Sequence, residues 1–352
     1  MGRAEGDVHR EKGEAGGESV RVGFVYSGRY LEHNPGTWHP ESPARLTAIT
    51  GKLKDEGLWE NVHEPEPAKM REILAVHDES YVRWLMEMCR NRIPVDSDTP
   101  TAENTFEIAA LSAGGALLAG RLVESGEVDF AFALIRPPGH HAGRSSGGGF
   151  CYLNNIAIMT RDLLRRVGRV LIFDFDAHHG NGTQEIFYKD PEVLYISVHQ
   201  SPLYPGTGKV EEIGEGEGRG FNINIPVPPG TGDEEYATIV DEILIPVAVQ
   251  FEPEIIAVSA GFDAHARDPL TQLELSGGFY GWMAGKIFET AERICGGRVV
   301  FLLEGGYDLR GLSESVVNVV RAAKGKRFAE PARRRLGIVE KIRSALSWKW
   351  RI

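Results

Sequence analysis

One stretch of the chain, RVLIFDFDAHHGNGTQ at residues 169–184, restricts the possible folds more than any other. Its apolar first part, 170–173, is typical of a buried parallel strand. Several ionisable side chains follow at once, and such groups are costly at the end of a buried strand unless something pairs them. Asp176 and His178 are two residues apart, so in an extended segment they point the same way and could bind one metal ion, such as zinc.

Strand-like and helical stretches alternate through most of the chain. Strands are expected at 22–26, 129–135, 170–173, 192–198, 222–227, 254–260 and 298–303. Helices are expected at 107–124, 155–167, 233–250, 278–295 and 312–323, and one that opens within 39–46 should run to about 57. Pro246 predicts a kink in the helix at 233–250. The alternation predicts an α/β fold in which helices cover both faces of a mostly parallel sheet.

Polar residues gather just after four of the expected strands. They are, in chain order, His140 and His141, the run from Asp174 to His178, Asp263, and Tyr307. In open parallel sheets, ligands bind beyond the carboxyl ends of the strands. The four segments are therefore expected to meet in one site.

The metal and the two histidines each allow a chemical and a structural interpretation. A catalytic zinc ion takes three protein ligands, so Asp263 is the candidate third ligand, although an aspartate after a strand can also cap a helix. His140 and His141 follow a rigid Pro-Pro-Gly sequence and could transfer protons near neutral pH. Asp174 and Asn181 are polar groups in the metal segment that could orient the two rings.

Tyr307 and a glycine-rich loop complete the candidate chemistry. The Tyr307 hydroxyl could donate to a polarised carbonyl oxygen, or the residue could simply close a turn. The three glycines before Phe150 could let backbone approach a substrate, with Phe150 as an apolar wall. A phosphate-binding loop is a weaker alternative, because no Gly-Lys-Ser/Thr sequence follows.

The composition is that of an ordinary soluble globular protein, with 352 residues and a formal net charge of −11. The negative charge argues against broad nucleic-acid binding and favours cationic substrates. Residues 1–20 are expected to be a disordered lead-in without a secretory signal, and residues 325–352 a basic tail whose helix packs on the acidic body. No apolar run is expected to span a membrane, and three scattered cysteines predict a reducing, cytoplasmic location.

Six motifs resemble those of the histone deacetylase family: RPPGHHA, GGGFCYLNN, DFDAHHGNGTQ, PGTG, AGFDAHARDPL and LEGGYD. The family includes acetylpolyamine amidohydrolases and deacetylase-like enzymes of bacteria and archaea. The resemblance implies a zinc-dependent deacetylase domain at residues 21–324, with the arginase–deacetylase fold and one zinc ion per chain. Pro138-Gly139 before the histidine pair, Asn181, and Leu270 after Asp268-Pro269 make the chain similar to class II members.

The resemblance also implies roles for individual residues. The zinc ligands would be Asp176, His178 and Asp263. The catalytic set would be His140, His141 as base and acid, their partners Asp174 and Asn181, and the carbonyl-polarising Tyr307. The substrate site would comprise Asp98 at the rim, Gly149, Phe150, Tyr204, Leu270, and Arg45 near an acetate exit. Potassium or sodium ions would occupy an inner site of Asp174, Asp176, His178, Ser197 and Val198, and an outer site of Phe187, Asp190, Val193 and Phe221.

Acetylated lysine in a protein or peptide is the expected substrate. Leu270 stands where a polyamine-specialised relative carries a glutamate, which disfavours an acetylpolyamine or another small acetylated amine, although Glu304 could supply that charge. An arginase-type two-metal hydrolase would need further carboxylates in the patterns Asp-x-His-x-Asp and Asp-x-Asp. Gly180 stands at the last position of the first pattern, and Asp263 is followed by Ala264 and His265. A non-catalytic binding protein would not need the full set of ligands, histidines and tyrosine. No nucleic-acid or membrane partner is expected, and the oligomeric state stays open.

Overall fold

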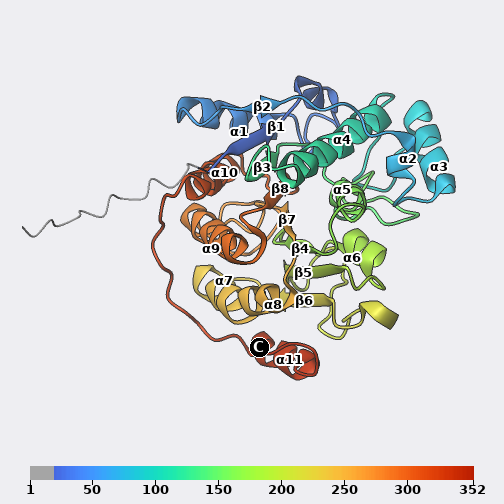
Figure 1. Cartoon of the computed structure of the whole chain (residues 1–352). Helices are drawn as coiled ribbons and strands as arrows, with labels where there is room; N and C mark the ends of the chain where they lie inside the picture. Colours follow the sequence, from blue (N-terminus) through green and yellow to red (C-terminus); the bar gives the residue numbers. More distant parts are fainter. Residues whose placement is uncertain (1–19) are drawn as a thin grey trace, which may run out of the picture.

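A sheet of eight parallel strands organises the chain, which this computed structural model describes over residues 20–352. Across the sheet the strands lie in the order β2 (Val62–His63), β1 (Val22–Val25), β3 (Phe130–Ala133), β8 (Val299–Leu303), β7 (Ile255–Ala260), β4 (Val170–Asp174), β5 (Val193–Gln200) and β6 (Asn222–Val227). Every neighbouring pair is parallel, which confirms the predicted α/β sheet (Figure 1). The expected disordered segment at 1–20 lies outside the described residues except for Val20.

Helices cover both faces of the sheet (Figure 1). One face carries α1 (Ala44–Asp55), α7 (Asp233–Ile239), α8 (Ile245–Phe251), α9 (Gly277–Cys295) and α10 (Leu309–Ala323). The other carries α4 (Thr105–Glu124), α5 (Asn155–Leu163) and α6 (Asn181–Phe187), with α2 (Met70–Ile73) and α3 (Glu79–Asn91) farther out. Strands β4, β5, β7 and β8 are buried at every position, as expected for a sheet covered on both sides.

Some elements differ from the sequence expectation. The stretch at 233–250 is helical throughout, as expected, but a π-helical turn, Val240–Leu244, lies between α7 and α8. Pro246 has no N–H to continue the α-helical ladder, so the chain reaches it through a wider turn. The helix expected at 155–167 ends at Leu163. Four elements of the structure, β2, α2, α3 and α6, were not predicted from the sequence.

Helix α4 is long and apolar enough to cross a membrane by length and composition alone, which corrects the expectation that no stretch is. However, 78% of its apolar window is buried inside the protein, as in a core helix. Glycines bring its backbone close to its neighbours. A Cβ on Gly114 would lie 1.9 Å from the Glu66 carbonyl oxygen, and a Cβ on Gly115 would lie 2.4 Å from the Tyr30 hydroxyl. A larger side chain at either position would push α4 away.

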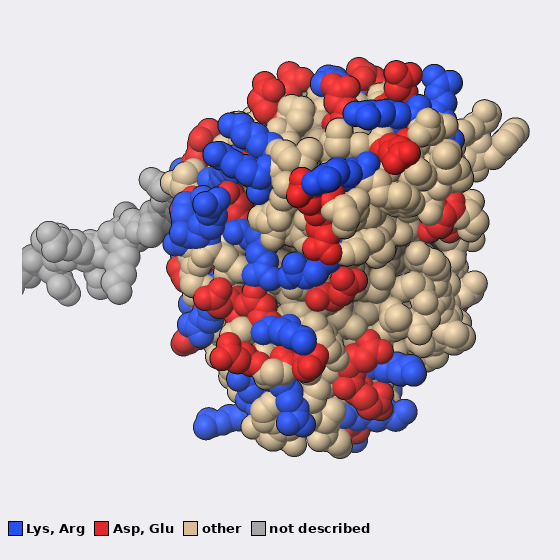
Figure 2. Space-filling view, turned by 90° about the vertical axis from the view of Figure 1, so that its right-hand side faces the viewer, with Lys and Arg blue, Asp and Glu red and all other residues tan. Residues whose placement is uncertain are grey.

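The C-terminal residues 325–352 run across the molecule and end beside edge strand β6, where they form α11 (Gly337–Leu346) (Figure 1). Basic side chains of this segment pair with acidic ones near α7: Arg333 with Asp241, Arg334 with Glu235, and Arg343 with Glu242. Trp350 is buried and donates to the Gly220 carbonyl oxygen at 2.7 Å. Figure 2 shows basic and acidic side chains interspersed over part of one face, beside a broad area with few of either.

A buried ion cluster ties the N-terminal part of the domain to its centre. Glu41 accepts two hydrogen bonds of 2.8 Å from Arg136 and one of 3.2 Å from Arg45. All three side chains are at most 1% exposed. Burial raises the pKa of Glu41, but the two guanidinium groups outweigh it and hold the pKa at about 2.

We expect Glu41→Gln to lower the free energy of unfolding, measured with urea, by about 3–5 kcal/mol, because two buried guanidinium groups lose their anion. Since the folded pKa of Glu41 is depressed, its contribution is present above the reference value of 4.5 and is lost as the pH falls toward 2. Glu79→Gln breaks an exposed pair with Arg83 and is the matched control, with an expected cost of about 0.5 kcal/mol or less. Equal costs for the two variants would contradict this role of Glu41.

Candidate active site

Four neighbouring strands bring the site residues of the sequence reading together at one edge of the sheet. In spatial order, β3 leads to His140 and His141, β8 to Tyr307, β7 to Asp263, and β4 to Asp176 and His178. The register keeps the strand ends level, since Asp174 pairs with Ser259 and Ala260 pairs with Leu303. Segments that are distant in sequence therefore meet beyond the carboxyl ends of the strands.

Asp176, His178 and Asp263 form a compact cluster in which one possible ligand atom of each lies within 4.8 Å of the others. His178 Nδ1 is 3.2 Å from Asp176 Oδ1 and 2.8 Å from Asp263 Oδ2. Backbone groups hold both carboxylates, because Ala177 N donates to Asp263 Oδ1 at 2.8 Å and Gly305 N donates to Asp176 Oδ2 at 2.7 Å. Two carboxylates and an imidazole at this spacing can hold a metal ion.

The pKa values within this cluster reflect its concentration of buried negative charge. Burial and the neighbouring Asp176 raise the pKa of Asp263 to about 7. Burial lowers the pKa of His178, but Asp176 and Asp263 more than reverse this and raise it to about 10. The arrangement therefore favours a positive charge between the carboxylates, which a proton on His178 or a metal ion could supply.

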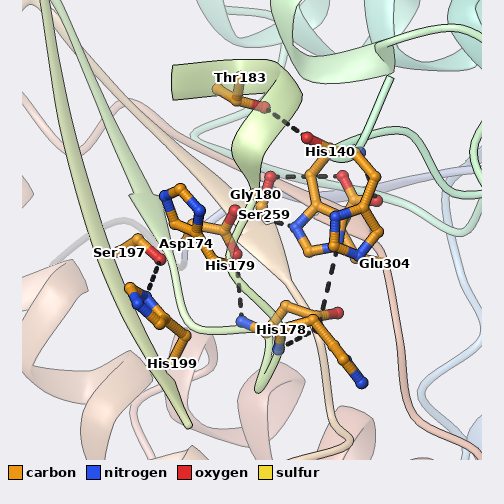
Figure 3. Close-up of polar contacts among 12 residues, drawn as sticks. His140, Asp174, His178, His179, Gly180, Thr183, Ser197, His199, Ser259 and Glu304 are labelled. Atoms are coloured by element: carbon orange, nitrogen blue, oxygen red, sulfur yellow. Dashed lines mark hydrogen bonds and ion pairs between the residues drawn. The ribbon is translucent and has the colours of Figure 1, made fainter. Parts of the chain in front are cut away.

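The adjacent histidines His140 and His141 have different partners. His140 Nδ1 lies 3.0 Å from Asp174 Oδ2 (Figure 3), and His141 Nδ1 lies 2.8 Å from Asn181 Oδ1. Asp174 also accepts a hydrogen bond of 3.1 Å from the Tyr195 hydroxyl. One ring thus faces a carboxylate and the other a neutral amide, which gives the two rings different basicity.

The pKa values of the two histidines diverge accordingly. Burial lowers the pKa of His140, but Asp174 and Asp176 outweigh it and raise the pKa to about 10. Burial and the neighbouring cation of His140 hold the pKa of His141 well below its usual range. These directions favour a proton on His140 and a neutral His141 with one ring nitrogen able to accept a proton.

The loop after β8 carries Tyr307. Arg45 donates to the carbonyl oxygens of Gly306 at 2.7 Å and Glu304 at 2.5 Å, and its guanidinium carbon lies 5.1 Å from the centre of the Tyr307 ring. The Tyr307 ring also packs edge to face on Phe150, with the ring centres 5.8 Å apart. Burial raises the pKa of Tyr307 well above its usual range, so the hydroxyl keeps its proton and can donate it in a hydrogen bond.

Gly149, Phe150 and Tyr204 form walls beside His141. The rings of Tyr204 and His141 meet edge to face, with centres 5.1 Å apart. A Cβ on Gly149 would lie 2.5 Å from His141 Cδ2 and 2.8 Å from Tyr204 Cε1, so only glycine fits. Phe150 adopts a φ of 69°, which a bulky residue rarely takes. The structure thus holds this loop in an unusual conformation next to the histidine pair.

Asp98 lies at the edge of these walls, with an exposed side chain. Its carbonyl oxygen is 3.0 Å from His39 Nε2, and the His39 ring packs on Phe150 at 4.6 Å. Burial and the neighbouring carboxylate of Asp96 raise the pKa of Asp98. Leu270 is half-buried on the loop after β7 and presents no charge. The outer end of the site therefore carries two carboxylates, and the position of Leu270 carries none.

The residues of the inner cation set lie together. Asp174 pairs with Ser197 across β4 and β5, Val198 follows Ser197, and Asp176 and His178 belong to the metal cluster. Ser197 Oγ lies 2.9 Å from His199 Nδ1 (Figure 3).

The residues of the outer cation set are already engaged with other protein groups. The carbonyl oxygen of Phe187 accepts from Asp190 N at 3.0 Å, and that of Phe221 accepts from Tyr195 N at 2.9 Å. The Asp190 carboxylate pairs with Arg161. Val193, the remaining member, begins β5.

Glu304 contributes to the site in a way that the sequence reading missed. Its carboxylate is 1% exposed and accepts hydrogen bonds from Gly139 N at 2.7 Å and His140 N at 3.3 Å. It also accepts one of 3.3 Å from Ser259 Oγ. Figure 3 shows Glu304 beside His140. Glu304 therefore holds the loop of the tandem histidines, and these contacts do not favour it as the charge that pairs with a substrate. Its position directly after a buried strand was the available signal.

Comparisons with known proteins agree with this geometry. A family model described as a histone deacetylase domain matches residues 39–323. A probable deacetylase of Archaeoglobus fulgidus is 47% identical over 311 residues, which cover 86% of each chain. Histone deacetylase 10, chloroplastic, of Oryza sativa subsp. japonica is 40% identical over 336 residues, which cover 88% of this chain and 76% of that protein.

A solved structure extends the agreement to the fold. The crystal structure of the HDA15 HD domain aligns with a TM-score of 0.87 and 32% identity, covering 94% of this chain and 95% of that chain. The single parallel sheet with helices on both faces is thus the arginase–deacetylase fold expected from the motifs. The chain belongs to the histone deacetylase family of amide hydrolases.

Proposed function

We propose that this protein removes acetyl or related short acyl groups from lysine side chains with the help of one zinc ion. One observation carries the proposal: a buried cluster able to hold a metal ion lies beside two histidines whose pKa values diverge. Amide hydrolysis needs both a polarised carbonyl group and a base that is neutral at pH 7.

The donor set of Asp176, His178 and Asp263 fits zinc. Three protein ligands of this kind leave a position open for water and substrate. When bound, zinc would polarise the substrate carbonyl and lower the pKa of water to about 7. A two-metal centre of the arginase type finds no support, because Gly180 and His265 stand where its further carboxylates would be needed.

His141 carries out proton transfer in this proposal. Because its pKa is low, the ring is unprotonated at neutral pH, so a nitrogen is free to take the proton of the attacking water and later pass one to the leaving amine. His140, which Asp174 keeps protonated, places a positive charge beside the developing negative charge. Tyr307 donates a hydrogen bond to the carbonyl oxygen as that charge develops.

The walls of the site favour a lysine side chain. Its flexible apolar stem can pass between Phe150 and Tyr204, while the exposed Asp98 accepts a hydrogen bond from the substrate backbone. A small acetylated amine such as an acetylpolyamine is the second candidate, favoured by the paired carboxylates of Asp96 and Asp98. For the distal ammonium group of a polyamine, however, Leu270 offers no carboxylate as a partner.

The proposal also includes a monovalent cation and a cellular location. Potassium or sodium is proposed at the inner set around Asp174 and Ser197, where a carboxylate lies next to backbone oxygens. A reducing, cytoplasmic location is supported by Cys89, Cys151 and Cys295, which are all buried and unpaired.

We expect Asp263→Ala to lose bound zinc and activity together, because one of three ligands is removed. Elemental analysis should find one zinc ion per chain in the wild type and much less in the variant. His179→Ala is the matched control, because the His179 ring contacts Thr207 and Gln184 and lies next to a ligand without being one. Stoichiometric zinc in Asp263→Ala would show that the ligand assignment is wrong.

We expect Tyr307→Phe to lower kcat by about a hundredfold to a thousandfold with little change in KM, because the hydroxyl acts mainly in the transition state. Tyr280→Phe provides the control, since it removes a buried hydroxyl that has no hydrogen-bond partner. Steady-state kinetics separate the two parameters. A Tyr307→Phe enzyme within twofold of wild type would remove Tyr307 from the mechanism.

We expect a higher kcat/KM for acetyl-lysine peptides than for acetylspermidine or acetylputrescine, because nothing at Leu270 neutralises a distal cation. Leu270→Glu should shift the ratio toward the polyamines, and Leu270→Gln controls for polarity without charge. A wild-type preference of tenfold or more for an acetylpolyamine would reject the lysine assignment and favour the second candidate.

A further inference from the structure

Asp268 is a buried carboxylate that the mechanism above does not use. It is 8% exposed and lies on the loop after β7. One carboxylate oxygen, Oδ1, accepts from Leu270 N at 3.0 Å within its own turn. The other oxygen, Oδ2, accepts from Tyr307 N at 2.7 Å and from Asp308 N at 3.4 Å. Asp268 therefore connects the loop that carries Asp263 to the loop that carries Tyr307.

The peptide bond between Gly306 and Tyr307 is held at both ends. Its carbonyl oxygen, on Gly306, accepts from Arg45 Nε at 2.7 Å, and its N–H, on Tyr307, donates to Asp268 Oδ2 at 2.7 Å. Both partners are charged, and charge-assisted hydrogen bonds are about twice as strong as neutral ones. The plane of this peptide unit sets the direction in which the Tyr307 side chain leaves the backbone.

The loop after β8 needs its Gly306–Tyr307 peptide unit held in place. Gly306 has a φ of 118°, a conformation open to glycine, which also has more backbone freedom than any other residue. A glycine directly before the oxyanion donor would leave Tyr307 poorly positioned unless something fixed the following peptide unit. Misplacement by about 1 Å can cost a hundredfold in rate.

We propose that Asp268 is a positioning residue that fixes the Gly306–Tyr307 peptide unit and thereby aims the Tyr307 hydroxyl. The inference rests on the proposed role of Tyr307 and adds a residue to which the mechanism gives no part. The alternative is that Asp268 only closes its own turn through Leu270 N. That role would affect the stability of the loop without a specific link to Tyr307.

A double-mutant cycle of Asp268→Asn with Tyr307→Phe separates these two roles. Asparagine has a single side-chain acceptor oxygen, so its NH₂ group would face either the N–H of Leu270 or the N–H groups of Tyr307 and Asp308. We expect Asp268→Asn to lower kcat by about a hundredfold with little change in KM and with zinc content unchanged. In the Tyr307→Phe background the same change should lower kcat by less than about twofold, because the donor to be positioned is already gone.

Two further variants complete the design. Asp268→Ala removes both acceptor oxygens and should behave as Asp268→Asn does in the cycle. Asp162→Asn is the control for loss of a partly buried aspartate, since the Asp162 side chain is 10% exposed and pairs with Arg121 and Arg166 away from the site. It should leave kcat unchanged. All kinetics use the acetylated substrate that the wild type hydrolyses fastest, so a failure of the lysine assignment does not affect this test.

The inference would be overturned if the loss of kcat caused by Asp268→Asn did not depend on the Tyr307 hydroxyl. If Asp268→Asn lowered kcat by the same factor with and without the Tyr307 hydroxyl, Asp268 would act on something else. A single variant within twofold of wild type, or one that lost its zinc, would overturn it as well. If Tyr307→Phe alone had no effect, the proposed role of Tyr307 would fail, and this inference with it.

Discussion

Buried negative charge at the ends of the central strands is the constraint on which the rest of this site depends. Asp174, Asp176, Asp263 and Glu304 are each at most 1% exposed. Isolated charges in such surroundings cost several kcal/mol each, so each one needs a partner. His140 and His178 provide positive charge, and a metal ion between Asp176 and Asp263 would provide more. These buried charges lower the stability of the folded protein, and they are the same charges that amide hydrolysis requires.

Backbone N–H groups provide the remaining support, and they do so between loops. Gly305 N donates to Asp176, Ala177 N to Asp263, and Gly139 N to Glu304. Each carboxylate therefore fixes the backbone of a neighbouring loop as well as its own position. Such reciprocal contacts let loops from four strands act as one rigid unit, which is what a preorganised site needs.

The sheet and the location of the site could be predicted from the sequence because both follow from local patterns. Apolar runs that end in polar residues mark parallel strands and their carboxyl ends, and the parallel register brings those ends level. Helix α3 could also have been found, since Tyr81, Val82, Leu85 and Cys89 are buried at helical spacing. Helix α6 is short and begins inside the motif that carries Asp176 and His178, where its few residues carry a weak helical signal.

The supporting contacts could not be predicted in the same way. Glu304 and Gly139 are 165 residues apart in sequence, and no local pattern links a carboxylate to one particular N–H group at that distance. The role of Asp268 likewise depends on the position of Tyr307, 39 residues away. The motif around the two histidines indicated their chemistry, but their different pKa values depend on partners that only the folded chain brings close.

The most direct test of the central claim is anomalous X-ray scattering at the zinc edge from crystals of the zinc-loaded protein. The account predicts one strong peak per chain, within bonding distance of Asp176, His178 and Asp263 and with an open position toward His141. Two peaks at this centre, or one peak bound by other residues, would contradict it.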